Sequence, residues 1–156
     1  MKGHKMNHYP NHPRFITVAE FDARGQYQNV NVAPLVATES TDTTAVYDVR
    51  ENQTPVLVPH VAPFGKDWLW SADTQKWTLI DNYAVVSVYS KIRGEQCAPP
   101  EFGDELTNDM TLKTPPSEPE KITYWDAQAA GWAMRDDLTG KQVFSTAAPR
   151  PALVLR

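Results

Sequence analysis

Residues 70–77 read WSADTQKW, and residues 125–132, fifty-five positions later, read WDAQAAGW. Each stretch has a tryptophan at either end, so four of the chain's five tryptophans share one spacing. Two residues seven positions apart can face each other across the short connection of a β-hairpin. Opposed side chains on such a ribbon lie ~5 Å apart at Cβ, where two indoles pack and add about 0.5–1.5 kcal/mol beyond burial. The spacing therefore predicts two hairpins, each closed by a tryptophan pair.

A weaker third copy lies near the N-terminus, where Phe21-Asp22-Ala23 and Tyr27 flank a turn that contains Gly25. The surrounding residues 15–32 alternate and are rich in β-branched side chains, which is typical of strands. Aromatic residues on both sides of a glycine-containing turn predict another hairpin of the same kind.

The rest of the chain also favours strands. We expect further strands at 45–49 (AVYDV), 55–61 (PVLVPHV) and 83–90 (YAVVSVYS), and a hairpin at 121–134. Pro55 and Pro59 restrict the second of these to an edge strand or an extended connection. No stretch of twelve residues has a clean helical period, and only residues 126–138 could form a short helix. The predicted fold class is mainly β, with small aromatic-rich hairpin units joined by Pro-rich extended segments and at most one short helix.

The predicted domain organisation follows changes in composition along the chain. Residues 94–120 contain five prolines, and residues 95–120 contain seven acidic residues against one basic residue, Lys113. Such a composition favours an extended, solvated connector. The expected order is a flexible tail, an N-terminal β domain, a Pro-rich acidic linker, a small C-terminal hairpin unit and an extended tail, at residues 1–13, 14–93, 94–120, 121–145 and 146–156.

Composition also bounds the partners. The net charge of −4 gives no reason to expect a nucleic acid or an anionic membrane as partner. The longest apolar run is strand-sized, far from the ~18 residues of a membrane span. Cys97 is the only cysteine, so an intrachain disulfide is excluded, which fits a reducing cytoplasm. We expect a soluble protein made in a cytoplasm.

Motifs that carry catalytic chemistry are missing from the sequence. It has no HExxH, GxSxG, CxxC or glycine-rich phosphate loop. His4, His8 and His12 have a helical ligand spacing, but Pro10 and Pro13 break any helix there. We therefore predict no catalytic residues, no metal site and no cofactor, and we expect that the protein is not an enzyme.

The tryptophans divide into two expected roles. Trp77 and Trp132 are expected to be structural, since each closes a hairpin. Trp68 and Trp70 lie two positions apart in a strand and share one face, where they form a broad aromatic patch. A patch that the chain does not cover needs a partner. We therefore expect Trp68→Ala or Trp70→Ala to weaken partner binding while leaving thermal melting nearly unchanged.

A Trp-bounded hairpin is followed by the stretch DNYAVVSVYSKIRGE (81–95), the Pro-rich passage FGDELTNDMTLKTPPSEPE (102–120) and a second WD-containing hairpin. In this order of motifs, residues 55–134 resemble the phage and prophage tail-fibre assembly proteins and the related repeats at tail-fibre ends. The basic residue that usually follows Asp-Tyr in the middle strand is missing, since the chain reads Asp81-Asn82-Tyr83-Ala84. The resemblance implies an assembly function without catalytic residues.

Three functional hypotheses follow. The first is a tail-fibre assembly chaperone that binds the fibre end through exposed aromatic hairpins, with Trp68, Trp70, Tyr124 and Trp125 as contact anchors. The second is a structural tail component, an adaptor or tip, that stays in the virion. The third is a glycan-binding tip module. The expected partner is a tail-fibre or other tail protein, with a glycan and a second copy of the chain as alternatives.

Overall fold

The computed structural model describes residues 11–140. The flexible tail expected at 1–13 falls mostly outside the described residues, as do the end of the hairpin unit at 141–145 and the extended tail at 146–156. Of the three histidines with helical spacing, only His12 is described, and its Nε2 lies 2.9 Å from the Thr41 carbonyl.

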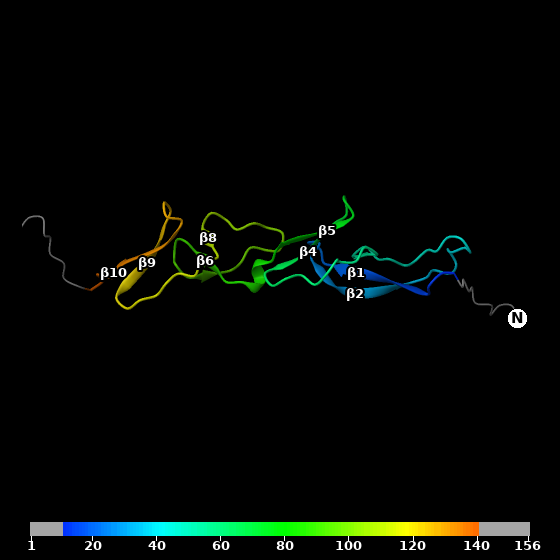
Figure 1. Ribbon diagram of the computed structural model, residues 1–156, viewed down its shortest axis with the longest axis horizontal. Coiled ribbons are helices and arrows are strands. Elements are labelled where there is room, and N and C mark those ends of the chain that lie inside the picture. Colours follow the sequence, from blue (N-terminus) through cyan, green and yellow to red (C-terminus); the bar gives the residue numbers. More distant parts are fainter. Residues whose placement is uncertain (1–10, 141–156) are drawn as a thin grey trace, which may run out of the picture. The chain divides into compact units, whose positions relative to one another are not determined.

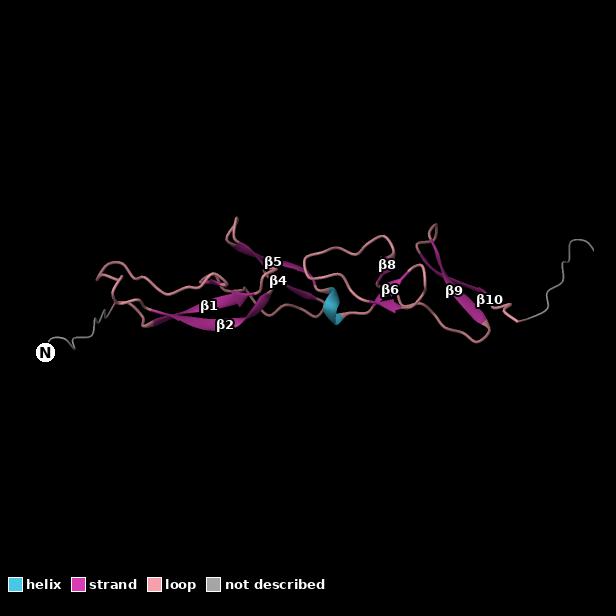
Figure 2. Ribbon diagram, turned by 180° about the vertical axis from the view of Figure 1, so that it is seen from behind, coloured by secondary structure: helices cyan, strands magenta, loops and turns pink. Residues whose placement is uncertain are grey.

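The described chain is mainly β, which confirms the predicted fold class (Figure 1). Its only described helical segment is a single 3-10 turn, η2 (Tyr83–Val85), drawn in cyan in Figure 2. The strands form four small antiparallel sheets with the orders β2-β1-β3, β4-β5, β7-β6-β8 and β10-β9. Their bounds are β1 Phe15–Phe21, β2 Tyr27–Pro34, β3 Gln53–Thr54, β4 Lys66–Ser71, β5 Lys76–Asp81, β6 Val88–Ser90, β7 Gln96–Cys97, β8 Met110–Thr111, β9 Lys121–Asp126 and β10 Gly131–Asp136.

The three predicted hairpins are present, and short polar side chains shape their turns. In the first hairpin, Asp22 Oδ1 accepts from the Arg24 and Gln26 amides at 2.9 and 3.0 Å. Gly25 takes the left-handed conformation there with a φ of 84°. In the β9–β10 hairpin, Asp126 Oδ1 accepts from the Gln128 and Ala129 amides at 3.0 and 3.3 Å. These carboxylates satisfy turn amides that the ladder leaves unpaired.

The strand register places the aromatic residues opposite one another, as their spacing predicts. Trp70 pairs with Trp77 across β4 and β5, and Trp125 pairs with Trp132 across β9 and β10. Phe21 pairs with Tyr27 after a β-bulge at the end of β1. All three aromatic closures proposed from the sequence are therefore confirmed.

The described residues group into two compact units. The first unit contains the residues up to Val86 together with Pro99–Glu105, and the second contains Ser87–Ala98 and the residues from Leu106 on. Each unit is built around a short central strand, β1 or β6, that pairs with one strand on each side. Each also has one Trp-closed hairpin, β4–β5 or β9–β10.

The two units share their detailed geometry as well as their strand order. Lys66 Nζ lies 2.7 Å from Asp81 Oδ1 at the open end of one hairpin, and Lys121 Nζ lies 2.8 Å from Asp136 Oδ1 at the other. The largest fully buried side chains are Val18 and Val88, which lie on the two central strands. The second unit is therefore a structural repeat of the first. The repeat includes the three-stranded sheets as well as the two Trp-closed hairpins.

Small sheets have small hydrophobic cores, and several polar side chains are buried in them. Buried polar groups need hydrogen-bond partners. Thr54 and Thr111, on the equivalent strands β3 and β8, are both buried. Their hydroxyls accept from the Val56 and Lys113 amides, both at 3.1 Å. No buried side-chain nitrogen or oxygen in residues 11–140 lacks a hydrogen-bond partner.

The strand predicted at 83–90 is wrong over its first half. Asn82 is buried, and its side-chain oxygen accepts from the Ala84 amide at 3.2 Å. This contact caps the 3-10 turn η2, and β6 begins only at Val88. The apolar alternation favoured a strand, but a local side-chain to backbone bond at Asn82 competes with the ladder.

The strand predicted at 45–49 is also wrong, because only one isolated bridge forms there, between Leu35 and Tyr47. The Val46 amide donates instead to Ser40 Oγ at 3.0 Å, so this backbone group is satisfied within the loop. Residues 55–61 form no strand and run as the extended connection that Pro55 and Pro59 allow.

Residues 94–120 differ from the predicted extended, solvated connector. They contain β7 and β8, which pair with the two sides of β6. Phe102 is buried, and the Arg24 guanidinium donates to its carbonyl at 3.0 Å. Arg24 also lies 2.5 Å from Glu101 Oε2. The acidic stretch was predicted to be solvated, but its Glu101 forms an ion pair with Arg24.

Candidate functional site

The predicted contact anchors lie in two aromatic clusters, one in each unit. In the first unit, the Trp70 and Trp77 rings are 5.2 Å apart between centroids. Phe21 stacks on Trp70 at 6.0 Å with an interplanar angle of 25°, and Tyr27 meets Trp77 edge-on at 5.8 Å. Aromatic residues of the β1–β2 hairpin therefore cover the tryptophan pair of the β4–β5 hairpin.

Trp68 is not an exposed anchor. Only 6% of its surface is accessible, and its indole N–H donates to the His60 carbonyl at 2.8 Å. The His60 ring meets it edge-on with centroids 5.1 Å apart. His60 covers Trp68, and Phe21 stacks on Trp70, so the sequence interpretation of an open patch is wrong at Trp68.

The tryptophans expected to be structural are tied to the chain in the same way in both units. The Trp77 indole donates to the Val56 carbonyl at 2.6 Å, and the Trp132 indole donates to the Lys113 carbonyl at 2.7 Å. Each acceptor lies two residues after the buried threonine, Thr54 or Thr111. Each indole therefore joins its hairpin to the Pro-rich passage that follows the third strand of the sheet.

The aromatic cluster of the second unit is more open. Trp125 and Trp132 meet edge-on with centroids 5.3 Å apart. Lys91 Nζ lies 4.7 Å from the centroid of Trp125, and Lys113 Nζ lies 6.0 Å from it. Tyr124 is 41% exposed, and the Arg135 guanidinium lies 5.5 Å from its ring centroid. Of the four predicted anchors, Tyr124 has the most accessible side chain.

A pocket of about 480 Å³ adjoins Trp125 in the second unit. Ammonium, carboxylate and amide side chains line it together with the indole and small apolar groups, contributed by Lys91, Ile92, Asn108, Asp109, Trp125, Ala127 and Ala130. Small-ligand sites usually combine apolar and aromatic side chains with a few polar groups, as this lining does.

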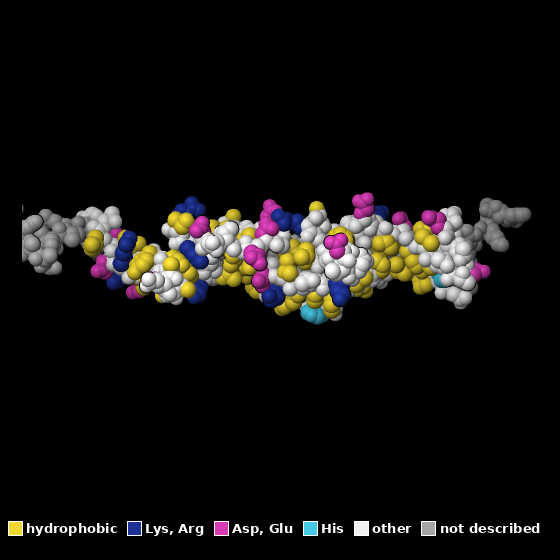
Figure 3. All heavy atoms as spheres, turned by 90° about the horizontal axis from the view of Figure 1, so that it is seen from above, with side chains coloured by type: hydrophobic (Ala, Val, Ile, Leu, Met, Phe, Trp, Pro, Cys, Tyr) yellow, Lys and Arg dark blue, Asp and Glu magenta, His cyan; other side chains and the backbone are white. Residues whose placement is uncertain are grey.

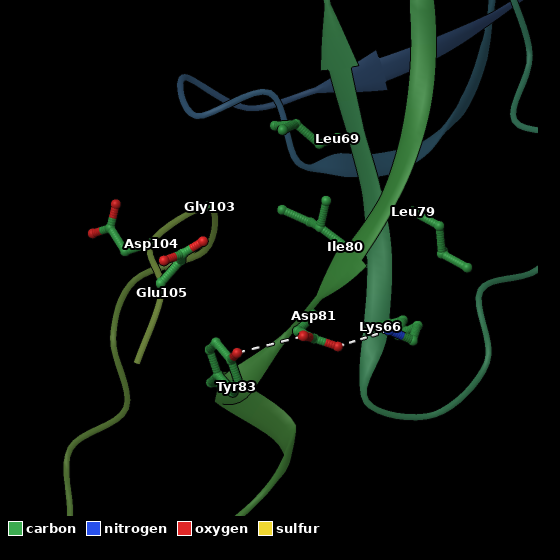
Figure 4. A pocket seen from close by; sticks show the side chains of 9 residues that line it. All are labelled: Lys66, Leu69, Leu79, Ile80, Asp81, Tyr83, Gly103, Asp104 and Glu105. Atoms are coloured by element: carbon green, nitrogen blue, oxygen red, sulfur yellow. Dashed lines mark hydrogen bonds and ion pairs between the residues drawn. The ribbon is translucent and has the colours of Figure 1, made fainter. Parts of the chain in front are cut away.

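The first unit has a pocket of about 580 Å³ between the β4–β5 hairpin and the loop Gly103–Glu105 (Figure 4). Leu69 and Ile80 point toward this loop, and Leu79 points away from it. The Lys66 ammonium beside Asp81 lowers the pKa of that carboxyl group, and burial is the main cause that raises the pKa of the Tyr83 hydroxyl. Both shifts favour the usual charge states at neutral pH, an ionised carboxylate and a neutral phenol.

A second feature of the first unit is the outer strand β2, whose one strand partner is β1. At the end of β2, the Pro34 carbonyl also accepts from the Asp48 amide at 2.9 Å. Val30 and Val32 are 56% and 52% exposed on one face of β2, and Phe15 on β1 is also exposed. The strand reads YQNVNVAP and contains no charged residue. Apolar side chains reach the surface in both units (Figure 3). Soluble proteins usually protect such edges with lysine, an early proline or a bulge.

Glu20 anchors the other edge of the same sheet. Its carboxylate accepts from Gln53 at 2.7 Å and from Asn31 at 3.1 Å. The Gln53 bond, followed by the Asn31 bond, lowers the pKa of Glu20. These bonds join β1 to both neighbouring strands, which leaves the outer side of β2 before Pro34 as the edge for pairing.

Other site chemistry is limited within residues 11–140. This part of the chain holds no group of three or more His, Cys, Asp or Glu side chains that could bind a metal ion. None of its helices is long and apolar enough to cross a membrane.

Sequence reasoning missed Lys91, Asn108 and Asp109, which lie beside Trp125 only because β6 and β8 pair. The signal that could have identified them is the match in sequence between the two units. In each unit, a threonine lies two residues before the residue whose carbonyl accepts from the indole.

Comparison with models of known protein families, with curated proteins and with solved structures finds no match for this chain.

Proposed function

We propose that this protein is a phage or prophage tail-fibre assembly chaperone that acts in the bacterial cytoplasm and binds a fibre segment along the free edge of β2. The observation that carries the proposal is this edge: an eight-residue strand without charges that exposes two valines. The tail-fibre resemblance of residues 55–134 supports the choice of partner. A folding fibre presents unpaired strands, and a protein with a complementary edge can cover them until the fibre assembles.

Strand addition is the proposed mode of contact. A partner strand beside β2 would satisfy the outward backbone groups of both chains, and its alternate side chains would meet Val30 and Val32. The Val32 amide now donates to the Asn31 side chain at 2.8 Å, a contact that a carbonyl of the partner can replace. Tyr124 and Trp125 remain candidate contact residues in the second unit.

A structural tail component that stays in the virion is the second candidate. Val61 and Phe64 favour it, because they are 90% and 84% exposed on an extended connection that a neighbouring subunit could cover. Mass spectrometry of purified virions separates the two candidates. A chaperone is absent from the particle, whereas a structural component is present at a fixed copy number.

Charging the β2 edge tests the proposed contact. The double variant Val30→Lys, Val32→Lys should abolish the gain in soluble trimeric fibre when the chain is co-expressed with the tail-fibre protein of the same genome. Two inserted lysines repel strand addition, as they do on natural protected edges. Both positions are more than half exposed, so the effect on stability should stay within about 1 kcal/mol. The yield of trimer on gel filtration is the readout.

The matched control is Val61→Lys, which makes the same change at an exposed valine outside the sheets. It should leave the trimer yield unchanged. If the β2 variant supports fibre assembly as well as the wild type, the β2 edge is not the docking site and the proposal fails.

A further inference from the structure

We propose that the pocket beside Trp125 binds a pyranose ring that carries a carboxylate, as in a uronic acid unit of an acidic glycan. The proposal concerns the second unit alone and is independent of the β2 contact. It rests on one difference between two otherwise matching aromatic clusters.

The matching position is fixed by backbone hydrogen bonds. In the first unit, the Phe21 amide donates to the Asn52 carbonyl at 3.0 Å, directly after the pairing of β1 with β3. In the second unit, the Lys91 amide donates to the Asp109 carbonyl at 2.7 Å, directly after the pairing of β6 with β8. Lys91 therefore occupies the position of Phe21.

The two residues cover equivalent tryptophans with different chemistry. Phe21 stacks a six-membered ring on Trp70, whereas Lys91 places an ammonium 4.7 Å from the centroid of Trp125. A phenyl ring closes its cluster, but a flexible lysine stem can move to the rim and leave the indole face open. The second unit thus has a site for a ring where the first unit has its own ring.

The polar groups around Trp125 indicate which ring fits. Within the described residues, the Lys91 ammonium forms no ion pair, and the Asn108 and Asp109 side chains form no hydrogen bond. Lys113 adds a second ammonium 6.0 Å from the Trp125 centroid, although it also donates to the Ala130 carbonyl at 2.6 Å. An amide and a carboxylate can bind hydroxyls, and an ammonium can bind a carboxylate through a charge-assisted hydrogen bond.

A saturated sugar ring with an acidic group combines these features. Its apolar face can stack on the indole, its hydroxyls can reach Asn108 and Asp109, and its carboxylate can reach Lys91. The volume of about 480 Å³ is within the range for small-ligand sites. An aromatic side chain of an acidic peptide would use the indole and the lysine but would leave the hydroxyl-binding groups unpaired.

Titration of the full chain followed by indole ¹H–¹⁵N NMR tests the proposal. Trigalacturonic acid should shift the Trp125 indole signal in a saturable way. Cellotriose, a neutral pyranose trimer, should bind at least tenfold more weakly, and so should the peptide acetyl-Glu-Phe-Glu-amide. No saturable shift with trigalacturonic acid, equal affinity for cellotriose, or preference for the peptide would each overturn the proposal.

Variants at Lys91 separate binding from folding. Lys91→Met keeps the stem and should weaken trigalacturonic acid binding about tenfold. Lys91→Phe recreates the Phe21 arrangement and should abolish binding without lowering the melting temperature. Lys76→Met, on an exposed lysine of the other hairpin, should bind as the wild type does. Full binding by a folded Lys91→Phe variant would contradict the proposal.

Discussion

Trp68→Ala should unfold the first unit at a markedly lower temperature, with a loss of about 3–5 kcal/mol in the free energy of unfolding. Trp68 is the most buried aromatic side chain that a described hairpin contributes, with 6% exposure. Its removal leaves a cavity and an unpaired His60 carbonyl. Since small domains have only about 5–15 kcal/mol of stability, we expect a fall in melting temperature of more than ~10 °C by circular dichroism.

Trp68→Phe is the matched control for this prediction. It keeps an aromatic ring in the site but removes the indole N–H that bonds to His60. The loss of one buried hydrogen bond should cost about 1–2 kcal/mol, well below the alanine variant. A Trp68→Ala protein that melts with the wild type would restore the sequence interpretation of Trp68 as a surface anchor.

Trp132→Ala should open the second unit and leave the first unit folded. The substitution removes the edge-on contact with Trp125 and the bond from the indole to the Lys113 carbonyl. Because the side chain is partly exposed, the expected loss is near the lower end for tryptophan, about 3 kcal/mol. An isolated hairpin is marginal in water, so β9 and β10 should lose their amide protection.

Indole and amide NMR signals read the two units separately. In the Trp132→Ala variant, the signals of Trp68, Trp70 and Trp77 should stay in place while those of β9 and β10 collapse. Trp132→Phe, which keeps the ring but loses the N–H donor, should show a smaller effect. Equal loss of structure in both units would show that the units do not fold independently.

The sequence was sufficient for the hairpins because their determinants are local. Paired tryptophans seven positions apart and turn residues such as Asp22 and Gly25 act within one hairpin. The strand at 83–90 was misplaced because a single Asn82 hydrogen bond outweighs the alternation of apolar residues. The acidic stretch was read as a linker because its arginine partner, Arg24, lies far away in the sequence.

The site residues were harder to predict, since burial of a tryptophan depends on what covers it. Trp68 and Trp70 share a face, as alternation requires, but nothing local shows that His60 and Phe21 lie against them. Lys91 takes its importance from comparison with Phe21, and that comparison needs the pairing of β6 with β8. The tryptophan spacing predicted the two hairpins of the repeat but not the three-stranded sheets that precede them.

Hydrogen exchange of β2 with and without the fibre tests the central claim most directly. The protein is mixed with the tail-fibre protein of the same genome, and exchange is followed by mass spectrometry over Tyr27–Pro34. Strand addition should slow the exchange of outward-facing β2 amides at least tenfold, since they gain carbonyl partners. Unchanged exchange in β2 within a complex that forms would contradict the account.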